Sequence, residues 1–109
     1  MSDQTPASAP RDAVRAVVPK LIDLTENVLF GDVWERSELS KRDRSLITIS
    51  VLTALYRTGQ LPGHLNRALD NGLTKEEIGE AITHVAFYAG WPCGMNAAQI
   101  AKQVFEERG

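Results

Sequence analysis

Two histidines and two arginines are the side chains of this sequence best suited to acid–base chemistry and to binding an anion. His64 falls beside the apolar positions of an expected helix, where a half-exposed imidazole can act as a general acid or base. A structural histidine, hydrogen-bonded to a backbone carbonyl, is the alternative for this position. Arg42 and Arg44 precede an apolar helix and either bind a substrate carboxylate or form a solvated first turn paired with neighbouring acids.

A second group of polar side chains recurs at helical spacing further along the chain. Its members are Glu77, Glu80, His84 and Tyr88. They share one helix face, which indicates either the polar wall of a cavity or a solvated surface. A metal site is a third interpretation, but no pair has the spacing of the His-Glu-x-x-His motif. We therefore expect neither a metal nor a cofactor.

Trp34 and Trp91 offer flat apolar surfaces that suit the wall of a ligand pocket or a subunit interface. Cys93, the only cysteine, lies just inside an expected helix N-terminus, where the helix dipole favours a thiolate. It is therefore either a reactive thiol or a buried, inert side chain. A single cysteine allows no intrachain disulfide and no Cys-x-x-Cys pair, so we expect a cytoplasmic protein.

The charge and the composition argue against several other classes of protein. The chain has 12 basic and 14 acidic residues, a net charge of -2 and no long run of either sign, so we expect no nucleic acid or anionic membrane as partner. No segment approaches the ~20 apolar residues that span a bilayer. Residues 1–10 are polar and lack the features of a signal peptide. We expect a disordered leader over residues 1–11 and one domain over residues 12–109.

Helix signals recur along the chain, and no stretch alternates apolar and polar residues for long enough to make a strand. The sequence predicts an all-α fold with helices over 12–18, 19–30, 40–56, 62–71, 74–89 and from the Gly90-Trp91-Pro92 break to about 107, with a connector or single turn at 34–39. Ser40 before Asp43 predicts a helix cap, and Thr74 with Glu77 predicts a capping box. The 40–56 helix is apolar on nearly all sides beyond its first turn, which predicts a homo-oligomer.

Five landmarks occur in a characteristic order and spacing between about Pro19 and Phe105. They are Gly31-Asp-Val-Trp34, Arg44-Ser-Leu-Ile-Thr48, His64-Leu-Asn-Arg-Ala68, Asn71-Gly-Leu-Thr74 with Glu77 and Ile78, and His84 with Tyr88-Ala-Gly90. Together they closely resemble the carboxymuconolactone decarboxylase family. The resemblance implies the all-helical alkylhydroperoxidase-D-like fold, assembled as a homo-oligomer that is a trimer or a hexamer.

The resemblance implies two candidate activities. The peroxidase branch carries a Cys-x-x-Cys pair before the histidine that aligns with His64, and Arg57 and Gln60 stand at those two positions here. The decarboxylase branch lacks the cysteine pair and has counterparts of Arg44, His64 and His84. The resemblance therefore favours a cofactor-independent decarboxylation of 4-carboxymuconolactone, or of a related lactone or keto acid, in aromatic-compound catabolism.

In that reaction we expect His64 to protonate carbon and Arg44 to stabilise the developing oxyanion. The residues expected to bind a small carboxylate or lactone substrate are Trp34, Arg42, His84, Tyr88 and Trp91. Two other functions stay open at this point. One is a single-thiol redox or peroxide-scavenging protein that uses Cys93, and the other is a non-catalytic helical oligomer that binds a small ligand.

Overall fold

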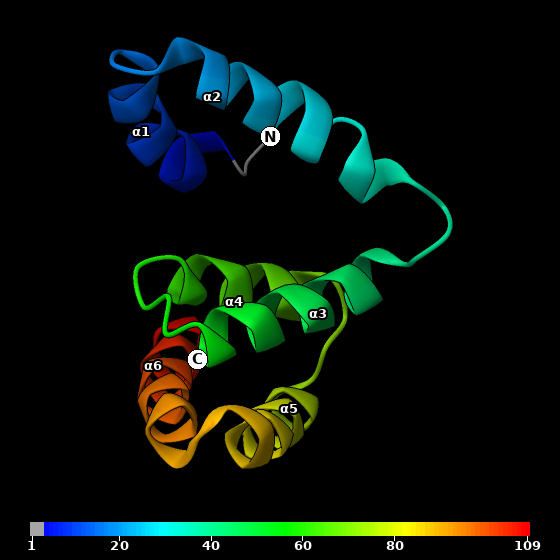
Figure 1. Ribbon diagram of the computed structural model, residues 1–109, viewed down its shortest axis with the longest axis vertical. Coiled ribbons are helices and arrows are strands. Elements are labelled where there is room, and N and C mark those ends of the chain that lie inside the picture. Colours follow the sequence, from blue (N-terminus) through cyan, green and yellow to red (C-terminus); the bar gives the residue numbers. More distant parts are fainter. Residues whose placement is uncertain (1–3) are drawn as a thin grey trace. The chain divides into compact units, whose positions relative to one another are not determined.

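In the computed structural model the chain divides into two compact units, Met1–Leu39 and Ser40–Gly109 (Figure 1). The structure describes residues 4–109, and their side chains from Pro10 onward. Every regular element in this range is helical, as the sequence predicts. The boundary between the units lies inside the single domain expected over residues 12–109, which stays a prediction. Among residues 4–109, no helix is both long and apolar enough to cross a bilayer.

The first unit consists of short helical elements. They are α1 (Gln4–Arg15), α2 (Pro19–Leu24), the π-helical η1 (Thr25–Leu29) and the 3-10 turn η2 (Val33–Glu35). α1 begins at Gln4, inside the segment where we expected a disordered leader, and it ends at Arg15 instead of residue 18. Residues 4–16 are rich in alanine, which has the highest helix propensity, and α1 forms although Pro10 lies inside it, where a proline is unfavourable.

The helix expected over residues 19–30 changes from α to π geometry at Thr25. The Thr25 hydroxyl donates a hydrogen bond to the Leu21 carbonyl oxygen at 2.8 Å, a contact that bends helices. At Gly31 a Cβ atom would lie 2.8 Å from the carbonyl oxygens of both Glu26 and Asn27. Only glycine therefore fits where the chain leaves this turn.

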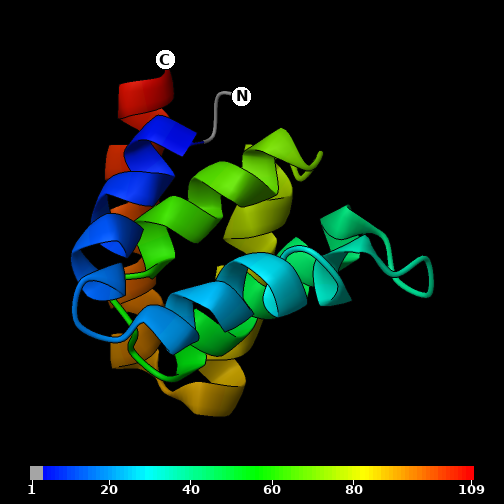
Figure 2. The ribbon, with the colours of Figure 1, turned by 90° about the horizontal axis from the view of Figure 1, so that it is seen from above.

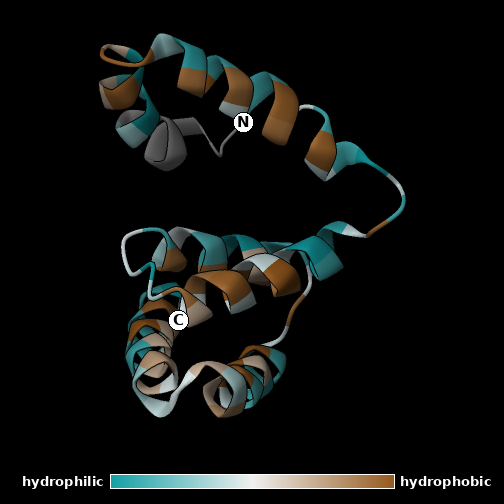
Figure 3. Ribbon diagram, in the orientation of Figure 1, coloured by the Kyte–Doolittle hydropathy of each residue, from teal (hydrophilic) through white to brown (hydrophobic). Residues whose placement is uncertain are grey.

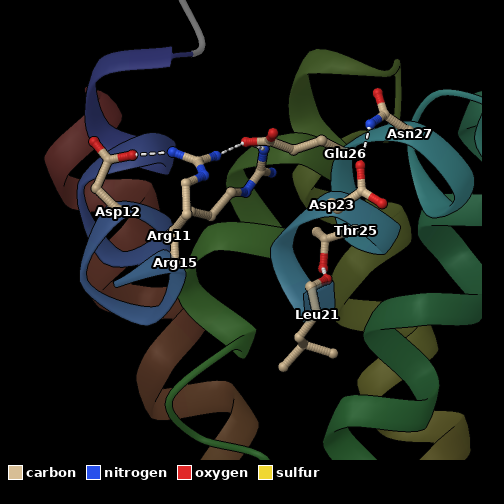
Figure 4. A network of polar contacts seen from close by, with 8 residues as sticks. All are labelled: Arg11, Asp12, Arg15, Leu21, Asp23, Thr25, Glu26 and Asn27. Atoms are coloured by element: carbon tan, nitrogen blue, oxygen red, sulfur yellow. Dashed lines mark hydrogen bonds and ion pairs between the residues drawn. The ribbon is translucent and has the colours of Figure 1, made fainter. Parts of the chain in front are cut away.

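Ion pairs link α1 to η1 within the first unit. Arg15 donates hydrogen bonds to Asp12 and to Glu26, and Arg11 lies 4.0 Å from the same Glu26 carboxylate (Figure 4). The Arg11 guanidinium also lies 5.1 Å from the centre of the Phe30 ring. Because these side chains are partly exposed, each ion pair contributes at most about 1 kcal/mol to stability.

The second unit is a helical bundle. Its members are α3 (Lys41–Ala54), α4 (Leu61–Asp70), α5 (Lys75–Ala89) and α6 (Trp91–Arg108). α3 packs against the other three helices, and α6 packs against α4 and α5 (Figures 1 and 2). The buried core contains Ile49, Leu61, Leu65, Ala68, Leu73, Ile78, Ile82, Ala97, Ala101 and Val104. Within each helix these residues recur every three or four positions or a multiple of that spacing, as expected of amphipathic helices.

The predicted signals mark the helix ends of this unit. Ser40 Oγ accepts a hydrogen bond from the Asp43 N–H at 3.0 Å and caps α3. Thr74 Oγ1 accepts from the Glu77 N–H, while Glu77 Oε1 accepts from the Thr74 N–H, each at 3.0 Å. This capping box satisfies backbone donors that α5 itself leaves unpaired. Gly72 follows α4 with a φ of 106°, a left-handed conformation that suits glycine.

α5 and α6 approach each other closely at Gly94. A Cβ atom at this position would lie 2.7 Å from the Cβ atom of Ala86 on α5. Glycine and alanine together therefore allow the two helices to touch, in an interior that is otherwise close-packed.

Candidate functional site

A cavity of about 390 Å³ lies between α3 and α5. The lining residues on α3 are Arg42, Leu46 and Ser50. They are spaced four residues apart and therefore share one face of the helix. The remaining lining residues are Leu73, Glu77, Glu80, Ala81, His84 and Val85. Glu77, Glu80 and His84, which belong to the polar face predicted on α5, all line this cavity.

A second hollow of about 380 Å³ continues this cavity toward the C-terminal ends of the two helices. The two hollows share Ser50, His84 and Val85, and the second is further lined by Val51, Ala54, Tyr88 and Ala89. We call the two hollows together the α3–α5 groove. Its N-terminal end carries charged side chains and its C-terminal end is mainly apolar. The groove therefore suits a small molecule with a polar group and an apolar body.

The charges at the polar end of the groove are paired. Arg42 Nη2 donates a hydrogen bond to Glu77 Oε2, and Arg42 Nη1 lies 3.4 Å from Asp43 Oδ1. The backbone N–H of Thr74, and then Arg42, lower the pKa of Glu77, although desolvation opposes them. A guanidinium has five N–H donors, so Arg42 can also bind one ligand carboxylate. A second negative charge would meet the carboxylate of Glu80, which lines the same cavity.

His84 and Tyr88 lie one helical turn apart on α5, with ring centres 5.0 Å apart and planes tilted by 31°. His84 lines both hollows, so its imidazole lies at the middle of the groove. Tyr88 lines the apolar hollow and is mostly exposed. The structure thus brings together three of the residues predicted to bind substrate, namely Arg42, His84 and Tyr88.

The two predicted catalytic residues lie elsewhere in the second unit. His64 is in the first turn of α4 and Arg44 is in the first turn of α3, two helices that pack together. Both side chains are half-buried, and the Nδ1 atom of His64 and the Nε atom of Arg44 are buried from solvent. Among the residues that the structure describes, neither His64 nor Arg44 lines the α3–α5 groove. Their catalytic roles stay predictions.

The two tryptophans have different surroundings. Trp34 lies in η2 of the first unit, where it is buried and its ring centre is 5.8 Å from that of Phe30. Trp91 begins α6, is half-exposed, and contacts Phe87 edge to face with ring centres 5.4 Å apart. Trp91 is not part of the groove lining among the described residues, so its predicted role in binding substrate has no support from the cavity.

Cys93 lies in the first turn of α6 and is half-buried. Its Sγ atom lies 3.6 Å from the carbonyl oxygen of Ala54 at the end of α3 and donates a weak hydrogen bond to it. The thiol therefore helps to join α6 to α3.

Ser50 lies at the junction of the two hollows but was not predicted from the sequence. Its position eight residues after Arg42, on the same face of α3, was the signal that could have identified it.

The helical bundle and its groove define an all-helical protein whose second unit has a hollow between α3 and α5. The model of the carboxymuconolactone decarboxylase family matches residues 19–103. The chain therefore belongs to this family, and the resemblance found in the sequence is confirmed.

Three relatives show how far the similarity extends. The chain is 44% identical over 80 residues to a 4-carboxymuconolactone decarboxylase of Acinetobacter baylyi, covering 73% of this chain and 60% of the relative. It is 32% identical over 78 residues to the nitrosuccinic acid decarboxylase npaB of Metarhizium robertsii, covering 72% and 54%. It is 33% identical over 98 residues to an uncharacterized 15.0 kDa protein of Paracoccus denitrificans, covering 87% and 72%. The chain thus spans little more than half the length of the two named decarboxylases.

Proposed function

We propose that the chain is a cofactor-independent carboxy-lyase that removes CO2 from 4-carboxymuconolactone, or from a related lactone or keto acid, in aromatic-compound catabolism. The observation that carries this proposal is the 44% identity to a protein named 4-carboxymuconolactone decarboxylase. A second relative is named a decarboxylase of nitrosuccinic acid, which is also a small carboxylic acid. Substrate classes of this kind match a groove that combines a guanidinium with apolar walls.

The chemistry needs a cation and a proton donor. The bond between carbon and the departing carboxylate breaks, CO2 leaves, and the electron pair moves into the unsaturated lactone. We assign Arg44 to the oxyanion that develops there and His64 to the proton transfer to carbon. The partial burial of both side chains supports these roles, because charges interact more strongly away from water.

The predicted substrate-binding residues Arg42, His84 and Tyr88 line the α3–α5 groove, which His64 and Arg44 do not line, so the groove and the His64–Arg44 pair are two separate candidate sites. Arg42 binds one carboxylate while keeping its bond to Glu77, and the apolar body of the ligand extends past His84 toward Tyr88. The carboxylate of Glu80 disfavours a second negative charge in this cavity. Because 4-carboxymuconolactone carries two carboxylates, Glu80 favours a related lactone or keto acid with a single carboxylate as the ligand of this groove.

The test is a spectrophotometric assay of the purified chain with 4-carboxymuconolactone, run beside His64→Ala and His84→Ala. His64→Ala should abolish turnover, whereas His84→Ala, which changes the separate α3–α5 groove, should leave kcat unchanged. Full activity of His64→Ala contradicts the catalytic role of that residue. If only His84→Ala loses kcat, the proton donor is His84 in the groove and not His64. If no variant turns over substrate but the chain binds a lactone in a thermal-shift assay, a non-catalytic binding protein is the better description.

We also propose that the chain acts as a homo-oligomer, a trimer or a hexamer. The exposed apolar residues of α3 support this proposal. Size-exclusion chromatography with light scattering at micromolar concentration tests it, and a monomer contradicts it.

A further inference from the structure

The buried face of α3 is narrow and carries two polar residues. Its buried members are Ser45, Ile49 and Thr53, which are 1%, 1% and 3% exposed and are spaced four residues apart. In Figure 3, α3 is hydrophilic in its first turn, and hydrophobic residues recur beyond it. Apolar contacts have no preferred direction. Near its N-terminus, the rotation of α3 about its own axis therefore depends on polar contacts.

Ser45 makes one of these polar contacts, with Asn71 at the C-terminal end of α4. Asn71 Nδ2 donates a hydrogen bond to Ser45 Oγ at 2.9 Å. Because Ser45 is almost fully buried, water cannot replace Asn71 as the donor. The bond between Arg42 and Glu77 also holds this end of α3, but its side chains are 38% and 43% exposed, so water competes with it. The bond from Asn71 is therefore the stronger constraint on the rotation of α3.

Asn71 lies in a turn that is itself firmly held. It is the C-cap residue of α4. The N–H of Gly72 donates to the Leu69 carbonyl oxygen at 3.2 Å. The N–H of Leu73 donates to the Ala68 carbonyl oxygen at 3.0 Å, which completes a Schellman ending, and the Leu73 side chain is buried in the core. The amide of Asn71 therefore starts from a fixed backbone.

Arg44 directly precedes Ser45 on α3. Successive side chains of a helix point about 100° apart, so the direction of Ser45 fixes the direction in which Arg44 leaves the helix. The backbone of Arg44 belongs to a fully bonded turn. Its N–H donates to the Ser40 carbonyl oxygen at 3.0 Å, and its carbonyl oxygen accepts the Thr48 hydroxyl at 2.8 Å. Any rotation of this turn therefore carries the guanidinium with it.

We propose that Asn71 is a positioning residue of the reaction, which acts through Ser45 and holds Arg44 in the direction that stabilises the developing oxyanion. This inference rests on the proposed role of Arg44. A displacement of about 1 Å can lower a rate roughly 100-fold, so a bond that fixes the rotation of a helix has a kinetic effect. Asn71 acts without contacting the substrate.

The first experiment measures the positioning of Arg44 without any substrate. Nuclear magnetic resonance follows how fast the Nε–H proton of Arg44, whose Nε atom is buried, exchanges with water, and Arg44→Lys identifies the signal by removing it. Ser45→Ala and Asn71→Ala each remove the bond, so exchange should be about tenfold faster or more than in the parent, because the turn opens more often. Asn66→Ala is the matched control and should leave the rate unchanged. Asn66 is also a half-buried asparagine of α4, but it accepts a hydrogen bond from Arg108 of α6 at 3.1 Å.

Two results of this experiment overturn the proposal. One is an unchanged exchange rate in Ser45→Ala, and the other is an equal acceleration in Asn66→Ala. Ser45→Ala replaces one small residue by the strongest helix former, so it keeps the test decisive even if Asn71→Ala does not fold. Circular dichroism must show the helix content of the parent in each protein that is compared.

The second experiment is the decarboxylase assay with the same variants. Asn71→Ala should lower kcat about tenfold or more and change KM little, because Arg44 is assigned to an interaction made only in the transition state. Combining Asn71→Ala with Ser45→Ala should lower kcat no further, since both remove the same bond. A kcat equal to that of an active parent in Asn71→Ala overturns the proposal. If the parent itself does not turn over the substrate, the proposed function fails, and the exchange rate of the Arg44 proton still decides whether Asn71 positions it.

Discussion

Glu77 joins the two helices of the groove at their N-terminal ends. One of its carboxylate oxygens accepts the Thr74 N–H and caps α5, and the other accepts a hydrogen bond from Arg42 of α3. Glu77 thus caps the N-terminus of α5, holds the Arg42 guanidinium at the edge of the cavity and offsets its charge. Holding the guanidinium and offsetting its charge depend on the ionised carboxylate, whereas the cap needs only an oxygen acceptor.

The stability of the protein should depend on the protonation of Glu77. Its pKa lies below the ordinary value of 4.5, because the Thr74 N–H and then Arg42 stabilise the carboxylate. Stabilisation is therefore complete above about pH 4.5 and is lost as the pH falls through the lowered pKa. Glu77→Gln keeps the capping acceptor but loses the charge, so its melting temperature should be below that of the parent at pH 7, and the gap should shrink below about pH 4.5. A gap that stays constant down to pH 3 contradicts this assignment.

Removing the other half of the capping box should also destabilise α5. Thr74→Ala leaves the Glu77 N–H without its side-chain acceptor, at a cost of about 1 kcal/mol. Thr83→Ala is the control, because the Thr83 hydroxyl bonds only within the helix, to the Gly79 carbonyl oxygen. Urea unfolding followed by circular dichroism measures both. Equal effects of the two substitutions would show that the cap contributes nothing.

Gly94→Ala should destabilise the second unit by roughly 1–3 kcal/mol, because the new methyl group would overlap Ala86 of α5. Ala86→Gly in the same chain should restore part of the loss, since it removes the atom in conflict. Gly79→Ala is the control, because a Cβ atom there meets nothing within 4 Å, and we expect unchanged or increased stability. Thermal unfolding of Gly94→Ala, Ala86→Gly and their combination gives the coupling, and Gly79→Ala is measured beside them. If Ala86→Gly does not restore stability to Gly94→Ala, the destabilisation does not come from contact with Ala86.

Cys93 should react slowly with iodoacetamide in the folded protein, because the thiol is half-buried and bonded to the Ala54 carbonyl oxygen. Labelling in urea, where the thiol is free, gives the reference rate. A folded-state rate equal to or above this reference would instead support the single-thiol redox function that the sequence leaves open.

Features of the fold that depend on neighbouring residues could be predicted from the sequence. The capping pairs at Ser40 and Thr74, the glycine at position 72 and the apolar spacing of the helices act within one or two turns. The all-α class and the polar face of α5 follow from the same local rules. The start of α1 and the π turn at Thr25 could not be predicted, because each reflects competition between helix propensity and nearby contacts.

The site itself depended on tertiary structure. Arg42 and His84 are 42 positions apart, and only the rotation of α3 against α5 decides that both face one cavity and that Glu77 offsets the charge of Arg42. The sequence by itself determined that the chain is helical, that it belongs among the carboxymuconolactone decarboxylase-like proteins, and that α3 is apolar on nearly all sides beyond its first turn. Packing alone decided which of its faces remains exposed, because burial depends on contacts between helices far apart in the chain.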